Sequence, residues 1–316
     1  MDITGASTPN DGCTYAGFTT NSLSVSGADY TINGYLYRVK LTTTAGGCET
    51  SSNPAILTVN PIPNVITPPA EQTECEFDNA TFTVSANNPS GSISSYQWQR
   101  TGAVIDAGTD GGAYTGFSTN TLTVNNPDRS FDGNIYRVIV RSDQNCPTVT
   151  PYVDLNINPL ADIDDQPDDE DICVGEDATF SVGTDGNPVA TGYQWEVSTN
   201  GGGTWNNVVG ADYSGGTTAT LTVSGVLIGK DGNLYRVRVF TAGGCDVVSD
   251  EALLTVYPPP TEKNITSAAS PVCYGGSTNV IIENSDLNVE YSVYFDSDDS
   301  FVGSVMGNGG NATVNT

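Results

Sequence analysis

The chain has 316 residues, enough for two or three domains of ordinary size, and its 10 Lys and Arg against 37 Asp and Glu give a formal net charge of −27. A surface of that sign repels nucleic-acid phosphates and anionic membranes, so the sequence excludes binding to either. Histidine is absent, which excludes Ser-His-Asp and Cys-His catalysis and any metal site built on His.

The remaining composition favours β structure. Glycine (35), proline (17) and tyrosine (15) are frequent, only 15% of residues are charged, and a mixture of this kind suits short strands joined by turns. No stretch has the roughly 18 consecutive apolar residues of a transmembrane helix, so we expect no membrane insertion in this segment. The N-terminus lacks the basic and apolar regions of a signal peptide. The chain is therefore either cytosolic or a piece of a longer exported protein.

An internal repeat of about 98 residues is the strongest signal in the sequence. The stretch 120–138 reappears at 218–237, and an earlier copy runs from 21 to 39. Two further landmarks, Trp98 and Trp195, stand 97 residues apart. A spacing of 99 separates the tyrosines that close each copy, which are Tyr37, Tyr136 and Tyr235. Several landmarks that share one period predict a tandem array.

Apolar and polar residues alternate over short runs within each unit, as they do in half-buried strands. Residues rich in Gly, Asn and Asp separate these runs and predict turns. Roughly seven strands in about 100 residues match an immunoglobulin-like sandwich. The predicted fold class is all-β, with tandem immunoglobulin-like β-sandwich repeats truncated at both ends. The clearest predicted strands are 80–85, 121–124, 135–140, 153–158 and 178–182.

Proline-rich joints divide the chain into four predicted pieces. Residues 1–60 form the C-terminal part of a repeat that lacks strands A to C. Residues 61–160 and 161–260 are complete repeats. Residues 261–316 form the N-terminal part of a further repeat, of a divergent subtype, because they never reach a Tyr-Arg-Val strand. A truncated sandwich exposes its core, so we expect the chain to be an excerpt from a longer array.

Five aromatic residues carry a resemblance to immunoglobulin-like domains. Trp98 and Trp195 stand where these domains bury a Trp on strand C, and Tyr37, Tyr136 and Tyr235 resemble the tyrosine of the E–F corner. The Cys that usually follows this tyrosine by two residues is Val in all three copies. The resemblance implies that the five aromatic side chains are structural, with the corner hydroxyls bonded to the backbone just upstream.

The motifs more closely resemble the immunoglobulin-like repeats of large surface proteins of the Bacteroidetes phylum, among them the giant gliding-motility adhesins exported by type IX secretion. They are Cys-x-Gly-Glu before strand B, Tyr-Gln-Trp, Gly-Gly-Thr-Trp, Gly-Asn-x-Tyr-Arg-Val and Gly-Gly-Cys before strand G. The resemblance covers almost the whole chain. It implies a non-enzymatic, extracellular segment of a cell-surface adhesin that forms a stalk or filament. Expected partners are a surface glycan or other cell-surface ligand, bound through another part of the protein, and the motility or secretion machinery.

Two other functions stay open. The repeats can be accessory domains of a secreted carbohydrate-active or proteolytic enzyme, although no residue of this chain is predicted to be catalytic. They can also bind glycan themselves, through loops such as 87–95 and 200–205. In the second loop Trp205 can stack on a sugar ring, whereas packing against its own sheet is the structural alternative.

Seven cysteines in a β protein of this kind suggest disulfides. Pairs within a repeat, Cys75 with Cys146 and Cys173 with Cys245, would each stabilise by roughly 4 kcal/mol. These partners lie at opposite poles of a sandwich, about 30 Å apart along strand G, whereas a disulfide needs Cα atoms within about 7 Å. A bridge between neighbouring repeats, such as Cys75 to Cys245, avoids this difficulty. Both pairings remain open. No Cys-x-x-Cys pair indicates a metal site.

An acidic run, residues 161–171, lies at the predicted joint between the second and third repeats. It holds six Asp and one Glu, which repel one another unless a hard cation lies among them. Calcium takes six to eight oxygen ligands, so the run is a candidate calcium site. The alternative is a solvated acidic linker. The candidate ligands are Asp162, Asp164, Asp165, Asp168, Asp169 and Asp171. Residues 296–300 begin like an EF-hand loop but have Phe301 where glycine is needed, which is a weaker match.

Overall fold

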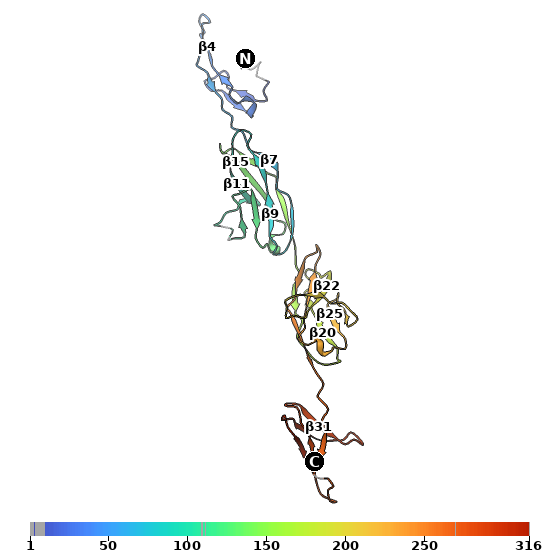
Figure 1. Ribbon diagram of the computed structural model, residues 1–316. Coiled ribbons are helices and arrows are strands. Elements are labelled where there is room, and N and C mark those ends of the chain that lie inside the picture. The colour runs from blue at the N-terminus through green and yellow to red at the C-terminus, as the bar shows by residue number, and fades with distance from the viewer. Residues whose placement is uncertain (1–2, 4–9, 109, 111, 269, 316) are drawn as a thin grey trace. The chain divides into compact units, whose positions relative to one another are not determined.

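The structure is a computed structural model and describes residues 3, 10–108, 110, 112–268 and 270–315 (Figure 1). The chain divides into two compact units. One comprises Met1–Leu160 with the short segment Thr241–Cys245, and the other comprises Ala161–Phe240 with Asp246–Thr316. The predicted start of the first repeat, at residues 1–6, lies outside the described residues apart from Ile3.

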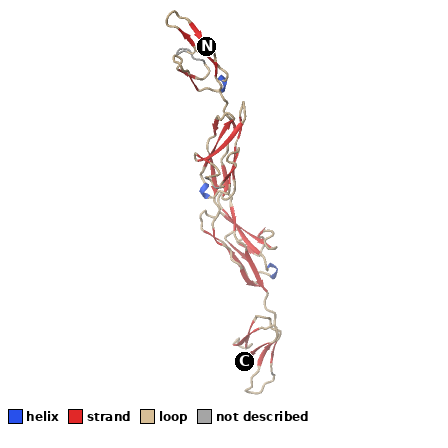
Figure 2. Cartoon of the chain, turned by 90° about the vertical axis from the view of Figure 1, so that its left-hand side faces the viewer, coloured by secondary structure: helices blue, strands red, loops and turns tan. Residues whose placement is uncertain are grey.

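Strands and loops make up nearly all of the described chain, and helix is confined to short turns (Figure 2). Three single turns of 3-10 helix are η1 (Tyr30–Ile32), η2 (Arg129–Phe131) and η3 (Ile228–Lys230). They begin 99 residues apart, so the sequence repeat is also a repeat of local structure. The predicted all-β class is confirmed.

The second repeat contains two sheets that face one core. The larger has the strand order β12-β11-β15-β17-β8, with β16 beside β15, and the smaller has the order β13-β14-β9. Strand β8 runs parallel to β17, whereas the other pairs are antiparallel. The strands are β7 (Asn64–Thr67), β8 (Gln72–Cys75), β9 (Ala80–Thr83), β10 (Ser85–Asn87), β11 (Ile93–Arg100), β12 (Ala103–Val104), β13 (Tyr114–Thr115), β14 (Thr121–Val124), β15 (Ile135–Ser142), β16 (Pro147–Val149) and β17 (Val153–Asn158).

Alternation along these strands decides which side chains enter the core. Every second residue of β15 is buried, as the period of two in a strand requires. The same alternation along β14 buries Leu122 and Val124 from the opposite sheet. Between them lie the rings of Phe82, Trp98 and Tyr136, none of which is exposed. The two sheets therefore form an immunoglobulin-like sandwich around an aromatic centre.

The third repeat follows the same plan. Its larger sheet has the order β19-β28-β26-β22-β23, with β27 beside β26, and its smaller sheet has the order β20-β25-β24. Phe180, Trp195 and Tyr235 take the places of the three central rings and are fully buried. The strands are β18 (Ile163–Asp165), β19 (Glu170–Cys173), β20 (Ala178–Ser181), β21 (Gly183–Thr184), β22 (Gly192–Ser198), β23 (Asn206–Asn207), β24 (Tyr213–Ser214), β25 (Thr220–Val223), β26 (Leu234–Phe240), β27 (Asp246–Val248) and β28 (Ala252–Tyr257).

The first piece of the chain leaves its apolar face open. Val39 and Leu41 are 50% and 57% exposed, whereas Val138 and Val140, 99 residues later, are fully buried. The described part of residues 1–60 has no counterpart of β9 or β11, so Val39 and Leu41 lack the strand that β11 places beside Val138 and Val140. Its strands are β1 (Thr14–Ala16), β2 (Ser24–Ser26), β3 (Leu36–Tyr37), β4 (Lys40–Thr42), β5 (Glu49–Ser51) and β6 (Ala55–Ile56).

Residues 261–316 build a smaller core around Ile282, Ala312 and Val314. One sheet has the order β29-β30-β33, and β31 pairs with β32. The strands are β29 (Ile265–Ser267), β30 (Asn279–Ile282), β31 (Glu290–Tyr294), β32 (Phe301–Met306) and β33 (Ala312–Asn315).

Candidate functional site: the Cys75–Cys245 disulfide and its surroundings

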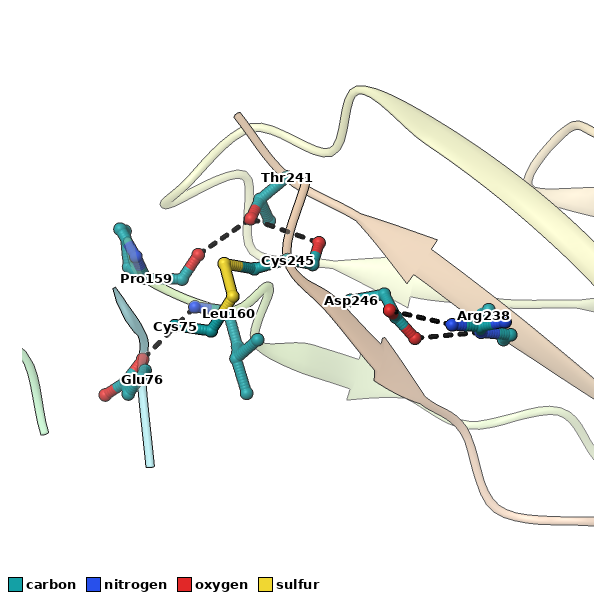
Figure 3. The surroundings of a disulfide bond; sticks show 8 residues. All are labelled: Cys75, Glu76, Pro159, Leu160, Arg238, Thr241, Cys245 and Asp246. Carbon is teal, nitrogen blue, oxygen red and sulfur yellow. Dashed lines mark hydrogen bonds and ion pairs between the residues drawn. A yellow bond between two sulfur atoms is a disulfide. The ribbon is translucent and has the colours of Figure 1, made fainter. Parts of the chain in front are cut away.

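The structure joins Cys75 to Cys245 in a disulfide, with Cα atoms 5.7 Å apart (Figure 3). Cys75 ends β8, where it lies beside Asn158 of the parallel strand β17. Cys245 ends the loop 241–245, which belongs to the same compact unit as Cys75 and leads from β26 to β27. Of the two pairings that the sequence left open, the structure therefore contains the bridge from one repeat to the next.

The alternative partner of Cys75 lies at the other end of the sandwich. Strand β17 pairs with the first residues of β15, whereas Cys146 follows the last residue of β15. The eight residues of β15 span about 27 Å at roughly 3.3 Å per residue, far more than a disulfide can bridge. Cys146 and Cys173 are free, as are Cys13, Cys48 and Cys273.

Hydrogen bonds fix the loop that carries Cys245. The hydroxyl of Thr241 donates to the carbonyl oxygen of Pro159 at 2.8 Å, and its N–H donates to the carbonyl oxygen of Cys245 at 2.9 Å. Gly243 has φ +96°, and a Cβ there would lie 2.6 Å from the side chain of Asn158. Glycine is therefore required where the loop approaches the end of β17, and Cys245 is only 1% exposed.

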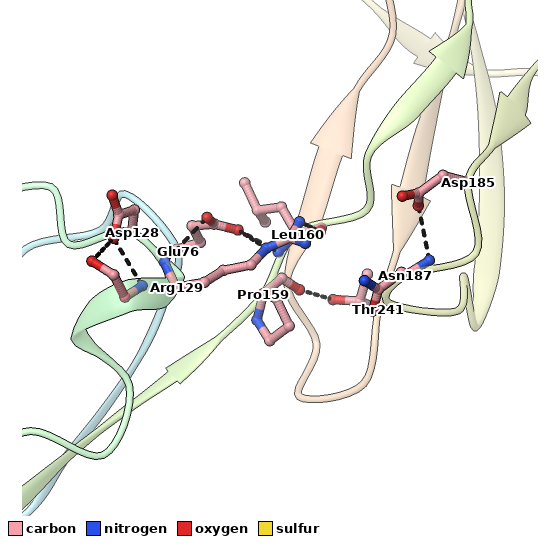
Figure 4. A network of polar contacts seen from close by, with 9 residues as sticks. Glu76, Asp128, Arg129, Pro159, Leu160, Asp185, Asn187 and Thr241 are labelled. Carbon is pink, nitrogen blue, oxygen red and sulfur yellow. Dashed lines mark hydrogen bonds and ion pairs between the residues drawn. The ribbon is translucent and has the colours of Figure 1, made fainter.

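A partly buried ion pair holds the end of the second repeat (Figure 4). The Nε of Arg129 donates to Glu76 Oε2 at 2.9 Å, and Glu76 is only 8% exposed. Both side chains also bind the peptide groups of Leu160: its N–H donates to Glu76 Oε2 at 3.2 Å, and its carbonyl accepts from Arg129 at 2.7 Å. The third repeat has Val174 and Ile228 at the equivalent positions, so this pair is particular to the second repeat.

Cys146 occupies the place in its repeat that Cys245 occupies in the next. Its Sγ lies 4.0 Å from the carbonyl oxygen of Asn60, which stands 98 residues before Asn158. The nearby Thr148 donates to the carbonyl oxygen of Pro63 at 2.6 Å. Cys173 ends β19 beside Tyr257, as Cys75 ends β8 beside Asn158, and is exposed.

The acidic run 161–171 is not a linker, and that interpretation of the sequence is corrected here. Ile163–Asp165 pairs with β21, and Glu170–Cys173 pairs in parallel with β28, so both ends of the run contribute strands to the third repeat. The alternation of apolar Ile163 and Ile172 with charged neighbours supplied a strand signal that the high charge obscured.

The structure does not bring the candidate calcium ligands together in one group. Among the residues that the structure describes, no group of three or more Asp, Glu or Cys side chains is arranged to hold a metal ion. The carboxylate of Asp169 accepts a hydrogen bond from the N–H of Leu253 at 2.7 Å instead. The remaining candidates are spread along the strands and turns of the run: Asp162, Asp164, Asp165, Asp168 and Asp171.

The predicted structural tryptophans lie in the two cores. The indole N–H of Trp98 donates to the carbonyl oxygen of Thr119, and that of Trp195 donates to the carbonyl oxygen of Thr218, each at 2.9 Å. Tyr37 is half-buried in the open first piece, and its hydroxyl lies 3.2 Å from the hydroxyl of Tyr15.

The corner tyrosines of the second and third repeats, Tyr136 and Tyr235, are buried, but their hydroxyls do not bind the backbone upstream, which corrects the expected tyrosine-corner geometry. The hydroxyl of Tyr136 lies 3.1 Å from that of Tyr114. The hydroxyl of Tyr235 is buried without a hydrogen-bond partner. The upstream aspartates hold the last strand instead: Asp132 accepts from the N–H of Ile157 at 2.8 Å.

Two motifs of side-chain to backbone hydrogen bonds were missed in the sequence, although both recur every 99 residues and could have been recognised from that spacing. One is an Asx-Gly corner whose side-chain oxygen accepts from the last strand, at Asn33, Asp132 and Asp231. The other is a Gly-x-x-Thr turn in which the threonine hydroxyl binds two neighbouring carbonyls, at Thr20, Thr119 and Thr218.

Trp205 packs against its own sheet. The guanidinium carbon of Arg236 lies 4.0 Å from the centre of the Trp205 ring, and the Nε of Arg236 donates to Glu196 at 2.8 Å. The second repeat has a similar arrangement, with Arg137 over the ring of Tyr152 at 4.6 Å. One face of the Trp205 ring is therefore covered by a cation.

No family model and no curated protein sequence matches this chain. Solved structures of tandem immunoglobulin domains are similar to it. The titin I-band fragment I67–I69 is 13% identical, covering 80% of this chain and 87% of its own, with a TM-score of 0.40. The Ig1-2 module of the Drosophila receptor protein tyrosine phosphatase DLAR is 18% identical (62% and 98% covered, TM-score 0.26), and the insect immune protein hemolin is 15% identical (71% and 56%, 0.37).

Within the described ranges, no helix has the length and apolar composition that crossing a membrane requires. The chain is a series of immunoglobulin-like repeats with one disulfide among its described residues.

Proposed function

We propose that this chain is a non-enzymatic segment of an extracellular repeat protein and acts as a stalk. The Cys75–Cys245 disulfide is the observation that carries the proposal, because disulfides form and persist in oxidising compartments outside the cytosol. A bond from one repeat to the next also serves to hold repeats in series, which is what a stalk requires. The motifs quoted above favour the surface of a bacterium, with a role in adhesion and gliding motility and export by type IX secretion.

In this function the repeats act as spacers. A glycan or other cell-surface ligand binds another part of the protein, and the motility or secretion machinery holds the anchored end. Direct glycan binding by these repeats is disfavoured by the packing of Trp205, whose ring is already stacked against Arg236.

Protease treatment of intact cells that carry the gene tests the location. We expect an antibody against residues 61–260 to lose its signal when protease is added to intact cells, while a cytosolic protein is spared. A signal that disappears only after lysis would contradict the proposal.

Purified chain tests the absence of catalysis and of direct glycan binding. We expect no turnover of peptide or glycoside substrates and no glycan-array signal above that of the Trp205→Ala variant. Turnover that is lost on replacing one carboxylate would show an enzyme. A glycan signal abolished by Trp205→Ala would show that the repeats themselves are the binding surface.

A further inference from the structure

The Cys75–Cys245 disulfide closes a large covalent loop. The two cysteines are 170 positions apart, so residues 76–244 lie inside the loop. These residues include strands β9 to β17 of the second repeat and β18 to β26 of the third. The buried core residues of the second repeat all lie inside the loop, and so do those of the third repeat except the ones that β28 supplies. The strands left outside are β7 and β8 before Cys75, and β27 and β28 after Cys245.

We propose that this bond carries tension around the two repeats, so that a pull on the ends of the chain bypasses residues 76–244. The inference rests on the proposed function, since a stalk is loaded only when both of its ends are held. A covalent bond does not yield under forces that separate hydrogen-bonded strands. The pull therefore passes from β8 through the two sulfur atoms to β27.

The strands along this path can be named. In the second repeat β7 pairs with β10 and β8 pairs with β17. In the third repeat β27 pairs with β26, and β28 lies between β19 and β26. If the pull detaches all of these strands, only residues 61–75 of the second repeat and residues 246–260 of the third can extend, which is fifteen residues in each repeat. The second repeat then keeps all of its buried core residues and the third loses only those of β28, so the detached strands can pair again when the pull ends.

The surroundings of the bond protect one of its two sulfur atoms from exchange. Cys245 is 1% exposed, whereas Cys75 is partly exposed, and attack by another thiol requires access to the sulfur. The hydrogen bond from Thr241 to Pro159 holds the loop against the end of β17, and Gly243 leaves room for the side chain of Asn158 there. The bond is therefore held at both sides by contacts within one compact unit.

Single-molecule extension of the whole 316-residue chain, tethered at its two ends, tests the proposal. At roughly 3.6 Å per extended residue, the loop hides about 600 Å of chain. We expect the fully stretched oxidised chain to be shorter than the reduced chain by that amount. The Cys75→Ser and Cys245→Ser variants should reach the full length without reductant. Because this is the length of a fully extended chain, it does not depend on how well each variant folds.

Cys173→Ser is the matched control. It leaves the Cys75–Cys245 bond in place, so the oxidised variant should be as short as the oxidised parent chain. If the cysteines paired within each repeat, Cys173→Ser would lengthen the oxidised chain by about 250 Å. That result, or equal lengths for the oxidised and reduced parent chains, would overturn the proposal. A cytosolic location would overturn the stalk function but would leave these lengths unchanged, so the two failures are distinguishable.

Discussion

Tyr136 and Tyr235 are equivalent buried residues of the second and third repeats, but their hydroxyl groups differ in hydrogen bonding. Tyr136 shares a hydrogen bond with Tyr114, which also accepts from Arg100 at 3.1 Å. Tyr235 also lies against a phenylalanine and against Tyr213, the counterpart of Tyr114, but its hydroxyl makes no hydrogen bond of acceptable geometry with Tyr213. A buried hydroxyl without a partner destabilises a fold, whereas a paired one contributes about 1 kcal/mol.

Tyr136→Phe and Tyr235→Phe should therefore have different effects on stability. We expect Tyr136→Phe to lower the free energy of unfolding of the second repeat by about 1 kcal/mol, because the hydrogen bond between the two tyrosine hydroxyls is lost and Tyr114 keeps only the bond from Arg100. Tyr235→Phe should leave the third repeat unchanged or more stable. Hydrogen exchange of the amides in β15 and β26 measures the free energy of unfolding of the second and the third repeat separately. Equal losses in both repeats would contradict this interpretation.

The same tyrosines make the protein sensitive to alkaline pH. Burial, and for Tyr136 the hydrogen bond to Tyr114, raises the pKa of both phenols above the ordinary value of 10.0. The unfolded chain therefore loses these protons at a lower pH than the folded chain does. Their contribution to stability is fully present below pH 10 and declines as the pH rises above it.

Denaturant titrations at pH 8 to 11.5 measure this alkaline loss. We expect the midpoint to fall above pH 10, and to fall less steeply when Tyr136 is replaced by Phe. A midpoint that stays constant through pH 11.5 would show that the two phenols ionise alike in the folded and unfolded chains.

At the scale of the element, the Gly-x-x-Thr turn connects a tight bend to the core. Gly116 has φ +72°, and a Cβ there would lie 2.1 Å from the carbonyl oxygen of Thr121. The hydroxyl of Thr119 donates toward the carbonyl oxygens of Gly116 and Thr121, and accepts from the N–H of Thr121 at 3.2 Å. The carbonyl of Thr119 then accepts from the indole of Trp98. The turn thus positions a buried tryptophan from outside the core.

Thr119→Ala should loosen Trp98. We expect the free energy of unfolding of the second repeat to fall by about 1 kcal/mol, and the indole N–H of Trp98 to exchange faster with solvent. Ser118→Ala, at the exposed neighbouring position, is the control and should change neither quantity. Unchanged indole exchange in Thr119→Ala would show that strand packing alone fixes the tryptophan.

At the scale of the whole molecule, the cysteines are either disulfide-bonded or free, and a thiol-specific reagent distinguishes the two classes. Without reductant, denatured chain should take up five equivalents of a maleimide, and reduced chain should take up seven. Peptide mapping should find Cys75 linked to Cys245. In the native chain Cys13 should react slowly, because desolvation and the nearby Asp11 carboxylate raise the pKa of its thiol. A peptide that links Cys75 to Cys146 would contradict the structure.

Periodicity alone determined most of the fold. The runs predicted as strands at 121–124 and 153–158 coincide with β14 and β17, because alternating burial leaves a direct trace in the residue order. The positions of Trp98 and Trp195 were likewise readable, since a large apolar ring at the same place in each repeat needs a core. The acidic run was misread, because charge dominated its composition while its few isoleucines set its strand positions.

Only the tertiary structure decided the polar contacts and the cysteine pairing. Spacing gave Cys75 two acceptable partners, and the choice depends on which sulfur lies within disulfide reach once β15 and β17 are formed. The Tyr136 hydroxyl likewise had several acceptors near it in sequence and took one 22 residues away. Burial patterns can be recognised in the sequence because the alternation of buried and exposed residues is a property of each strand alone. A hydrogen bond or a disulfide needs two groups at a fixed distance, and that distance exists only after the sheets have packed.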